Sequence, residues 1–266
     1  MRPTFSCGFL PSKQIMKLRN RTILITGGSS GIGLQLAKTL LDLDNTVIIC
    51  GRSESKLKEA RLLLPNVETI QSDIASESDR QRLMNKVYEN HPDCSVLVNN
   101  AAIVHKTDFK SDDQMNEKSR VEIKTNLEAP ICLSKLFLDH VGHRHDAAII
   151  NITTGLVFAP RAVYPVYNAT KAGLHSFTQA LRLQLKKEQT KIIEVMMPVV
   201  DTPWHKGDVP RIAISPEQAV AEMIRKIEKG KLEIHVGAVR TLYLLWRISP
   251  NLALRMINNI DDRKSQ

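Results

Sequence analysis

The hydrophobic residues of this 266-residue chain fall into two alternating patterns. Short runs rich in Ile and Val, without polar alternation, are typical of parallel strands buried on both faces. Longer stretches between them carry apolar residues at three- and four-residue spacing, which predicts amphipathic helices. The predicted strands cover residues 22–26, 46–50, 67–71, 95–99, 147–153, 192–197 and 233–236. The predicted helices cover residues 33–43, 53–64, 76–90, 115–141, 163–187 and 216–229.

Regular alternation of strands and helices predicts an α/β fold, with one doubly wound parallel sheet of about seven strands and helices on both faces. The crossovers between strands should be right-handed. No internal repeat or linker interrupts the pattern, so we expect a single domain over residues 16–237. Residues 1–15 match no element and are expected to form a disordered N-terminal extension.

The C-terminal residues 238–266 form a basic amphipathic tail, in which Leu, Ile, Trp and Tyr are mixed with Arg. Such a pattern most often packs against its own domain or against a partner subunit. A membrane surface is the less favoured alternative. The expectation is therefore a tail packed on the domain.

Charge and cysteine content narrow the classes of partner and compartment. The net charge of +9 is compatible with nucleic acid, an anionic membrane or a phosphate-bearing ligand. Nucleic acid is disfavoured because no arginine-rich stripe is interleaved with aromatic residues. The four cysteines lie far apart and lack metal-ligand spacing, which predicts free thiols in a reducing compartment and no metal site. No segment approaches the roughly 20 apolar residues of a membrane span, and no secretory signal is evident, so we expect a cytoplasmic protein.

A glycine-rich turn follows the first predicted strand and opens the first predicted helix. Glycine permits a tight turn and lets the backbone approach a pyrophosphate closely. The helix N-terminus then offers free N–H groups to the anion. The turn predicts a dinucleotide site formed by Thr26, Gly27, Ser29, Ser30, Gly31, Ile32 and Gly33.

The end of the second predicted strand indicates which dinucleotide binds. A carboxylate there would accept hydrogen bonds from the ribose 2′-hydroxyl of NAD. The segment instead ends in Gly51 and Arg52, and a guanidinium is suited to a 2′-phosphate. The alternative is that Arg52 only precedes a helix and points into water. The charge argument favours NADP(H) over NAD(H).

Tyr167 and Lys171 lie four residues apart near the start of a long predicted helix. This spacing places both side chains on one helix face, one turn apart. An ammonium near a phenol favours the phenolate, so we expect a Tyr167 pKa below its usual value of about 10. Such a tyrosine is suited to proton transfer with an alkoxide or alcohol. A chance pair on a solvated helix is the alternative for this motif taken alone.

These motifs occur in order with Asn99-Asn100-Ala101-Ala102, with Asn126, and with the pair Thr153-Thr154. Over residues 17–237 the chain resembles the short-chain dehydrogenase/reductase family, and its stretches VIICGRSESKL and VVDTP look more like the DltE-type bacterial oxidoreductases. The resemblance implies a Rossmann-type fold and an enzyme that transfers hydride between NADP(H) and a carbonyl or alcohol substrate. It also implies a homodimer or homotetramer.

The resemblance assigns catalytic roles to four positions. Tyr167 would be the general acid/base, and Lys171 would bind the nicotinamide ribose and assist the tyrosine. Asn126 would hold a water that links the lysine to solvent. Thr154 stands where the family usually has serine, so it keeps the hydroxyl but adds a methyl group. We expect retained activity with an altered site, and loss of turnover is the alternative.

Further positions would contact the cofactor. Asp73 would meet the adenine amino group, Asn100 would line the adenosine side, and Thr202 would contact the nicotinamide carboxamide. A turn role for Asp73 and buried structural amides at Asn100 and Asn126 are the alternatives. The remaining expected contacts are Ile74, Ala101 and Pro198, together with Arg52, Tyr167 and Lys171.

Two further departures and one short segment bear on function. Pro198 stands in place of the family's usual Pro-Gly pair after the sixth strand, and Ala102 replaces a frequent glycine. Only a short segment follows Thr202, so we expect an open substrate site, with Trp204 either covering substrate or packing on the core. A dinucleotide-binding regulatory or scaffold protein with little turnover is the second hypothesis. A sugar-nucleotide epimerase is disfavoured because the chain is too short for the extra substrate domain.

Overall fold

The structure is a computed structural model that describes residues 16–142, 146–205 and 210–260. The predicted extension, residues 1–15, and the end of the predicted tail, residues 261–266, lie outside the described residues. Within them, seven parallel strands form one sheet in the order β3-β2-β1-β4-β5-β6-β7. The strands are β1 (Thr22–Thr26), β2 (Thr46–Gly51), β3 (Glu68–Gln71), β4 (Cys94–Asn99), β5 (Ala148–Thr154), β6 (Lys191–Met197) and β7 (Glu233–His235).

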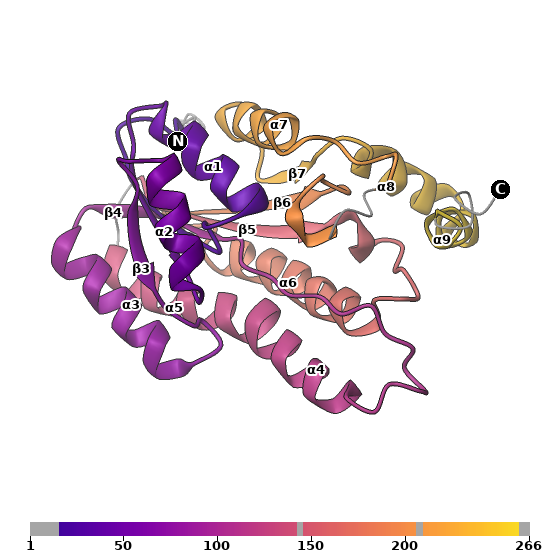
Figure 1. The fold of residues 1–266 in the computed structure, drawn as a ribbon. Coiled ribbons are helices and arrows are strands. Elements are labelled where there is room, and N and C mark those ends of the chain that lie inside the picture. The colour runs from indigo at the N-terminus through magenta and orange to yellow at the C-terminus, as the bar shows by residue number, and fades with distance from the viewer. Residues whose placement is uncertain (1–15, 143–145, 206–209, 261–266) are drawn as a thin grey trace, which may run out of the picture.

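Helices cover both faces of this sheet (Figure 1). One face carries α1 (Gly31–Leu41), α2 (Glu54–Leu63) and α7 (Pro216–Glu228). The other carries α3 (Glu77–Asn90), α4 (Met115–Ile123), α5 (Ala129–Val141) and α6 (Pro165–Gln184). Two further helices, α8 (Val239–Ile248) and α9 (Pro250–Asn258), precede the C-terminus and lie at the end of the molecule away from α2 and α3 (Figure 1). The predicted α/β fold with a doubly wound parallel sheet is confirmed.

Alternating side chains of each strand supply the two cores. Ile23 and Ile25 of β1 enter the core under α1 and α7, whereas Leu24 enters the core under α3 and α5. All three are completely buried. This is the reason that the central strands are mainly apolar, since neither face of a covered parallel sheet meets water, whereas the edge strand β3 keeps exposed polar residues at both ends.

Helix starts follow the local capping chemistry. Ser76 and Ser215 cap α3 and α7 as the sequence indicates, and Ser215 forms a complete capping box with Gln218. Ser53 caps α2 with its side chain, which accepts the N–H of Lys56. At α1, by contrast, Ser30 makes no side-chain cap and the first turn holds no acidic residue. The N–H groups at the start of α1 therefore have no side-chain acceptor.

Some predicted boundaries shift for identifiable reasons. The predicted helix 33–43 begins earlier, at Gly31, because the glycine-rich turn itself enters the helix. The predicted helix 115–141 contains a π-helical turn, η1 (Lys124–Glu128), between α4 and α5. The predicted helix 163–187 is shorter, because Pro165 sets its first turn and the helix ends at Gln184. In the tail, Pro250 starts α9 directly after the end of α8.

Candidate active site and dinucleotide cleft

The candidate site lies where the direction of the chain across the sheet reverses. From β1 the chain proceeds outward to β2 and β3, then returns to add β4 on the other side of β1. In open α/β sheets, ligands bind at the carboxyl ends of the strands beside such a switch point. The glycine-rich turn follows β1, and the Asn99-Asn100 pair ends β4. The topology therefore brings these two motifs to one edge.

The glycine-rich turn is packed so closely that larger residues would not fit. Gly27 has φ of +65°, and an added Cβ would lie 2.8 Å from the Ala101 Cα. A Cβ on Gly33 would lie 2.3 Å from the carbonyl oxygen of Gly27 and 2.6 Å from Nδ2 of Asn100. The glycines therefore allow the tight turn to pack closely against Ala101 and Asn100.

Thr26 and Asn100 tie the turn to the end of β4. The Thr26 hydroxyl accepts hydrogen bonds from the backbone N–H groups of Asn100 and Ala101, at 3.0 and 3.1 Å. The Asn100 side chain donates to the carbonyl oxygens of Thr26 and Gly27, at 3.0 and 3.1 Å. These contacts are those of a structural amide, the alternative given for Asn100 to a contact with the cofactor. They hold the turn in a fixed shape beside the cleft.

The start of α1 fits a pyrophosphate. Its free N–H groups lack a side-chain cap, and Gly31, with φ of +54°, exposes the backbone there. Ser29, Ser30 and Ile32 flank this position and are all partly exposed. Unpaired N–H groups at the positive end of a helix dipole attract an anion. The residues present thus fit the phosphates of a dinucleotide.

Of two other predicted contacts, Thr202 reaches this turn and Pro198 does not. The Thr202 side chain lies against Gly31, because a Cβ added to that glycine would be 3.2 Å from the Thr202 Cγ2. Pro198 is partly buried after β6 and lies beside Gly237, further from the turn. Thr202 follows an isolated bridge between Val200 and Ile214, which fixes the chain after β6.

Arg52, Asp73 and Ile74 lie on the β2–β3 side of the cleft. Arg52 is exposed, and no described acidic side chain forms an ion pair with it. The alternative given for Asp73 was a structural role in a turn. The structure shows such a turn contact, because the Asp73 Oδ1 accepts the N–H of Ala75 at 3.1 Å. Ile74 is buried in the core beneath. Arg52 is thus available to an anionic ligand beyond the end of β2.

Tyr167 and Lys171 lie one turn apart on α6, as predicted. The Lys171 Nζ is buried and donates to the carbonyl oxygen of Ile152 in β5 at 2.8 Å. It lies 6.0 Å from the centre of the Tyr167 ring. Burial lowers the pKa of Lys171 to about 8, and the nearby Glu194 carboxylate opposes this effect. The ammonium is therefore held at the carboxyl end of β5.

The expected lowering of the Tyr167 pKa is wrong for this structure. Burial raises the pKa of the phenol, and the carboxylate of Glu122 and the Tyr164 phenol add to the rise. Lys171 does not offset these effects, because its Nζ is engaged by the Ile152 carbonyl and lies toward the ring. Loss of hydration dominates when a phenol is enclosed by protein.

Thr154 and Asn126 complete the set of predicted catalytic positions. Thr154 ends β5, and its hydroxyl accepts the N–H of Leu156 at 3.3 Å, at the start of the short helix η2 (Gly155–Val157). Asn126 lies in the π-helical turn and is fully buried. Its amide binds both backbone groups of Ile103 and also donates to Thr170. Because Thr170 in turn donates to the Tyr167 carbonyl oxygen, Asn126 is linked to the tyrosine's helix turn.

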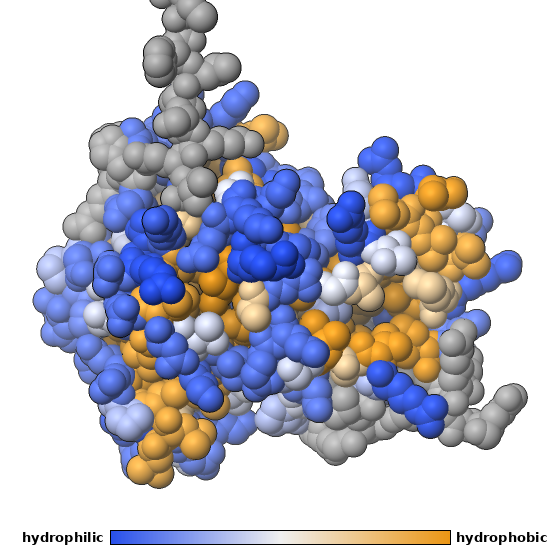
Figure 2. All heavy atoms as spheres, turned by 90° about the horizontal axis from the view of Figure 1, so that it is seen from above, coloured by the Kyte–Doolittle hydropathy of each residue, from blue (hydrophilic) through white to orange (hydrophobic). Residues whose placement is uncertain are grey.

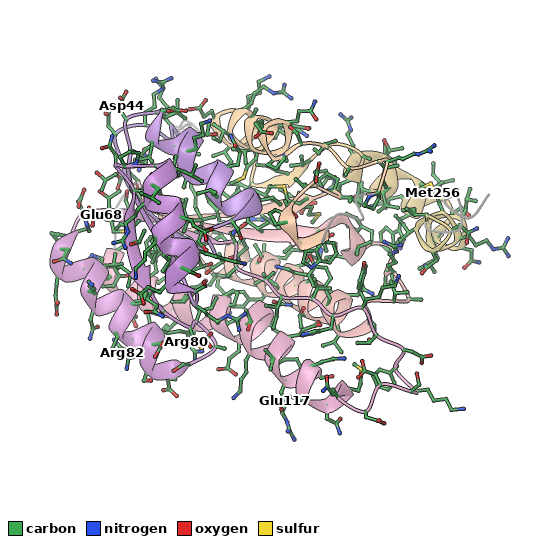
Figure 3. The ribbon with its side chains drawn as sticks, viewed as in Figure 1. Asp44, Glu68, Arg80, Arg82, Glu117 and Met256 are labelled. Atoms are coloured by element: carbon green, nitrogen blue, oxygen red, sulfur yellow. The ribbon has the colours of Figure 1, made fainter. Side chains whose placement is uncertain are left out.

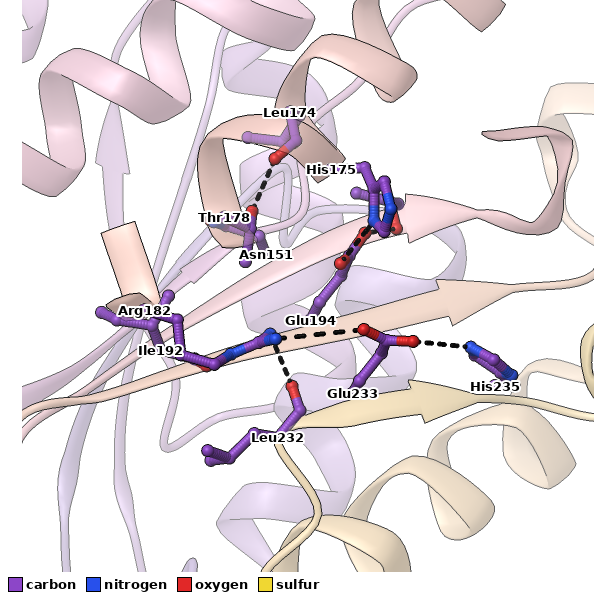
Figure 4. Close-up of polar contacts among 11 residues, drawn as sticks. Asn151, Leu174, His175, Thr178, Arg182, Ile192, Glu194, Leu232, Glu233 and His235 are labelled. Atoms are coloured by element: carbon purple, nitrogen blue, oxygen red, sulfur yellow. Dashed lines mark hydrogen bonds and ion pairs between the residues drawn. The ribbon is translucent and has the colours of Figure 1, made fainter. Parts of the chain in front are cut away.

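A buried carboxylate beside Lys171 was missed by the sequence analysis. Glu194 in β6 is completely buried and accepts a hydrogen bond from the Thr153 hydroxyl at 2.7 Å. His175, one turn after Lys171 on α6, lies with Nδ1 2.8 Å from Glu194 Oε2 (Figure 4). The available signal was a glutamate in the middle of an apolar strand, a position that requires a partner.

A second missed carboxylate lies on the α4 side. Glu122 is buried, and its Oε1 accepts both the backbone N–H and the ring N–H of His105, at 2.7 and 2.8 Å. Its Oε2 is buried and has no hydrogen-bond partner among the described residues. Burial raises the pKa of this carboxyl. The signal for it was an acidic residue on the inward side of a predicted helix.

The His175–Glu194 contact predicts a pH dependence of stability. The hydrogen bond to Glu194 raises the pKa of His175 above its usual value of 6.5. Protonated His175 therefore stabilises the fold fully below pH 6.5, and this contribution is lost as pH rises through the higher folded-state pKa. We expect the His175→Gln substitution to remove about 1 kcal/mol of this stabilisation, since His175 keeps some exposure although Glu194 is buried. Urea unfolding of both proteins at several pH values measures it, and parallel curves would contradict the prediction.

The aromatic side chains around Tyr167 define the substrate side. Tyr164 lies with its ring centre 6.5 Å from that of Tyr167 and 5.9 Å from that of Trp204. Trp204 belongs to η3 (Pro203–His205) and is partly exposed. Residues 206–209 of the short segment lie outside the described residues. Trp204 thus packs toward the candidate site and not into the main core.

A parallel sheet with a glycine-rich turn at its switch point, and with Tyr167 and Lys171 at the same edge, defines a nucleotide-binding protein of the dehydrogenase class. The family model described as short chain dehydrogenase matches residues 21–211. The chain belongs to this family and is an oxidoreductase of it.

Individual relatives agree with this assignment. The chain is 46% identical over 224 residues to the oxidoreductase DltE of Bacillus subtilis, covering 82% of this chain and 89% of the relative. The predicted similarity to DltE-type oxidoreductases is confirmed. The fold is similar to a short-chain dehydrogenase of Burkholderia cenocepacia in complex with NADP, with TM-score 0.79, 21% identity and coverage of 91% and 99%. A Sphingobium yanoikuyae short-chain dehydrogenase in complex with NADPH gives TM-score 0.75, 22% identity and coverage of 88% and 95%.

Proposed function

We propose that this oxidoreductase uses NADP(H) to interconvert a carbonyl and an alcohol, with Tyr167 as the general acid/base. The observation that carries the proposal is that Tyr167 and the buried Lys171, which donates to Ile152 in β5, lie at the carboxyl edge of the same sheet whose β1 leads into the glycine-rich turn. In this proposal the cofactor contacts are Thr26, Gly27, Ser29, Ser30, Gly31, Ile32, Gly33, Arg52, Asp73, Ile74, Asn100, Ala101, Tyr167, Lys171, Pro198 and Thr202.

The residues of the chain supply proton transfer and orientation. When bound, NADPH supplies the hydride. The raised pKa of Tyr167 keeps the proton on its hydroxyl, which is the form that donates to a developing alkoxide. The Thr154 hydroxyl is suited to hold the substrate oxygen near that phenol. The Lys171 ammonium, held by the Ile152 carbonyl oxygen, would bind the nicotinamide ribose, and Glu194 favours the charged form of the lysine.

Two kinds of observation support NADP(H) as the cofactor. Arg52 is exposed at the end of β2, and no described acidic side chain pairs with it. The two similar solved structures are complexes with NADP and NADPH. A guanidinium fits a phosphate with two parallel hydrogen bonds. We therefore place the 2′-phosphate beside Arg52.

Oxidation of NADPH, followed by its absorbance across a panel of aldehydes and ketones, tests the function. We expect turnover with at least one substrate, and the same panel with NADH measures the preference for the phosphate. NADPH binding without turnover of any panel member would favour a regulatory dinucleotide-binding protein.

Substitution of Arg52 by Asp is expected to shift the preference toward NADH. The change removes a cation from the 2′-phosphate and supplies a carboxylate for a 2′-hydroxyl. A charge-assisted contact contributes about 1.5–3 kcal/mol, so we expect NADPH affinity to fall about 10- to 100-fold. Fluorescence titration with both cofactors measures this ratio. Arg52→Gln is the matched variant that removes the cation without adding an acid, and an unchanged ratio in both would refute the role of Arg52.

A further inference from the structure

The helices α8 and α9 keep a continuous apolar surface outside the fold. Their inner sides pack into a small core of their own, formed by Ala159, Leu242, Ala253 and Ile257. Their outer sides carry large apolar side chains that are 43% to 85% exposed. These are Leu244 and Ile248 on α8 and Leu252 and Met256 on α9. Each pair is four residues apart and thus shares one helix face.

This outer apolar surface lies at one end of the molecule. Figure 2 shows apolar residues gathered over α8 and α9, with polar residues at their margin. Met256 lies at the opposite end from Asp44 and Glu68 (Figure 3). The helix α8, which carries part of this surface, begins close to the candidate site, because its buried residue Val239 lies against Gly155, the residue after Thr154.

The charged side chains that the described part of this segment carries have one sign. Residues 234–260 include Arg240, Arg247 and Arg255 and contain no Asp or Glu. All three arginines are exposed, and none forms an ion pair with a described acidic residue. A second copy of the same surface would place arginines against arginines. The charge pattern therefore favours an anionic partner with an apolar interior over self-association through this surface.

We propose that the outer surface of α8 and α9, together with its three arginines, docks the protein on the surface of an anionic lipid bilayer. Helices with apolar side chains on one side and basic residues at the margin lie in the interface between headgroups and acyl chains. No helix among the described residues is long and apolar enough to cross a membrane. The contact is therefore peripheral. The sequence favoured a tail packed on the domain over the membrane alternative, and the proposal instead rests on the large apolar side chains that α8 and α9 leave exposed.

Flotation of the full chain with vesicles tests the proposal. We expect the protein to float with vesicles of phosphatidylcholine mixed with phosphatidylglycerol, and not with phosphatidylcholine alone. The double substitution Ile248→Ser and Leu252→Ser should lower binding by about tenfold or more, because two apolar side chains no longer enter the interface. The matched control is Leu62→Ser with Leu63→Ser on α2, where Leu62 is 83% exposed, comparable to the 85% of Ile248.

Variants of the three arginines test whether their charge contributes to binding an anionic bilayer. Replacing Arg240, Arg247 and Arg255 by Gln should lower binding to the anionic vesicles on the order of a hundredfold, and added salt should weaken the parent in the same direction. The control replaces three exposed lysines elsewhere by Gln, so that net charge falls equally. These lysines are Lys86, Lys110 and Lys187.

Three outcomes would overturn the proposal. The parent does not float with anionic vesicles, or the surface variants float as well as the parent, or the control variants lose as much binding. Sedimentation of the parent and of the Ile248→Ser/Leu252→Ser protein tests whether a second copy of the chain, and not a membrane, covers the surface. If the double substitution converts an oligomer into monomers while the parent binds no vesicles, the surface is a contact between copies of the chain. The arginine variants keep the test valid if the apolar variants fold poorly.

Discussion

Replacing Tyr167 with phenylalanine is expected to lower kcat for carbonyl reduction by about 10²- to 10⁴-fold, the usual contribution of general acid catalysis. The substitution removes only the hydroxyl. The ring contacts with Tyr164 and with Lys171 remain, so the shape of the site changes little. NADPH affinity should therefore stay close to that of the parent, since the proposed function assigns the phosphates to the glycine-rich turn.

Two measurements together check this prediction. Single-turnover oxidation of NADPH reports the chemical step, and fluorescence titration reports the dissociation constant of NADPH. Tyr164→Phe is the matched control, because it removes the same atom from the neighbouring tyrosine and is expected to keep most of the parent kcat. A Tyr167→Phe enzyme as active as the parent would refute the assigned role, and a large loss of NADPH affinity would point to a structural role instead.

Substitution of Gly33 by alanine is expected to weaken NADPH binding by about 10- to 100-fold. The added methyl group would lie 2.3 Å from the Gly27 carbonyl oxygen, which is backbone and cannot rotate away. The turn must therefore shift, and at least one N–H group moves off the phosphate. The same overlap should lower the free energy of unfolding of the cofactor-free protein by about 1–3 kcal/mol.

Fluorescence titration with NADPH and urea unfolding without cofactor measure the two effects separately. Gly173→Ala in α6 is the control, because its Cβ would meet only the methyl groups of Leu127, at 3.2 Å, at the end of a flexible side chain. This control should bind NADPH as the parent does. If Gly33→Ala also bound NADPH as tightly as the parent, the turn would not be the phosphate site.

Much of the framework is local and was therefore predictable. The residues of β1 match the predicted strand 22–26 at both ends, because an unbroken apolar run is followed at once by Gly27. Ser76 and Ser215 cap their helices as expected, since a serine hydroxyl reaches an N–H only three residues away. The spacing of Tyr167 and Lys171 places them one turn apart in any α-helix.

Contacts between distant segments were not predictable in this way. The partners Glu194 and His175 come from β6 and α6, and Glu122 and His105 are likewise brought together by the fold. No periodic pattern pairs such residues, because each pattern describes only its own element. The π-helical turn around Asn126 likewise lies inside an uninterrupted helical pattern.

The order of strands and helices, the glycine-rich turn and the Tyr167–Lys171 spacing follow from the sequence alone, because they depend on neighbours within a few residues. Tertiary structure determined the pKa of Tyr167 and which apolar side chains of α8 and α9 stay exposed. Tyr167 has a raised pKa because burial and the Glu122 carboxylate of a distant helix disfavour the phenolate, and α8 and α9 leave apolar residues exposed because the domain covers only one of their sides. Hydration of a side chain is a property of everything packed around it, and no local pattern specifies that.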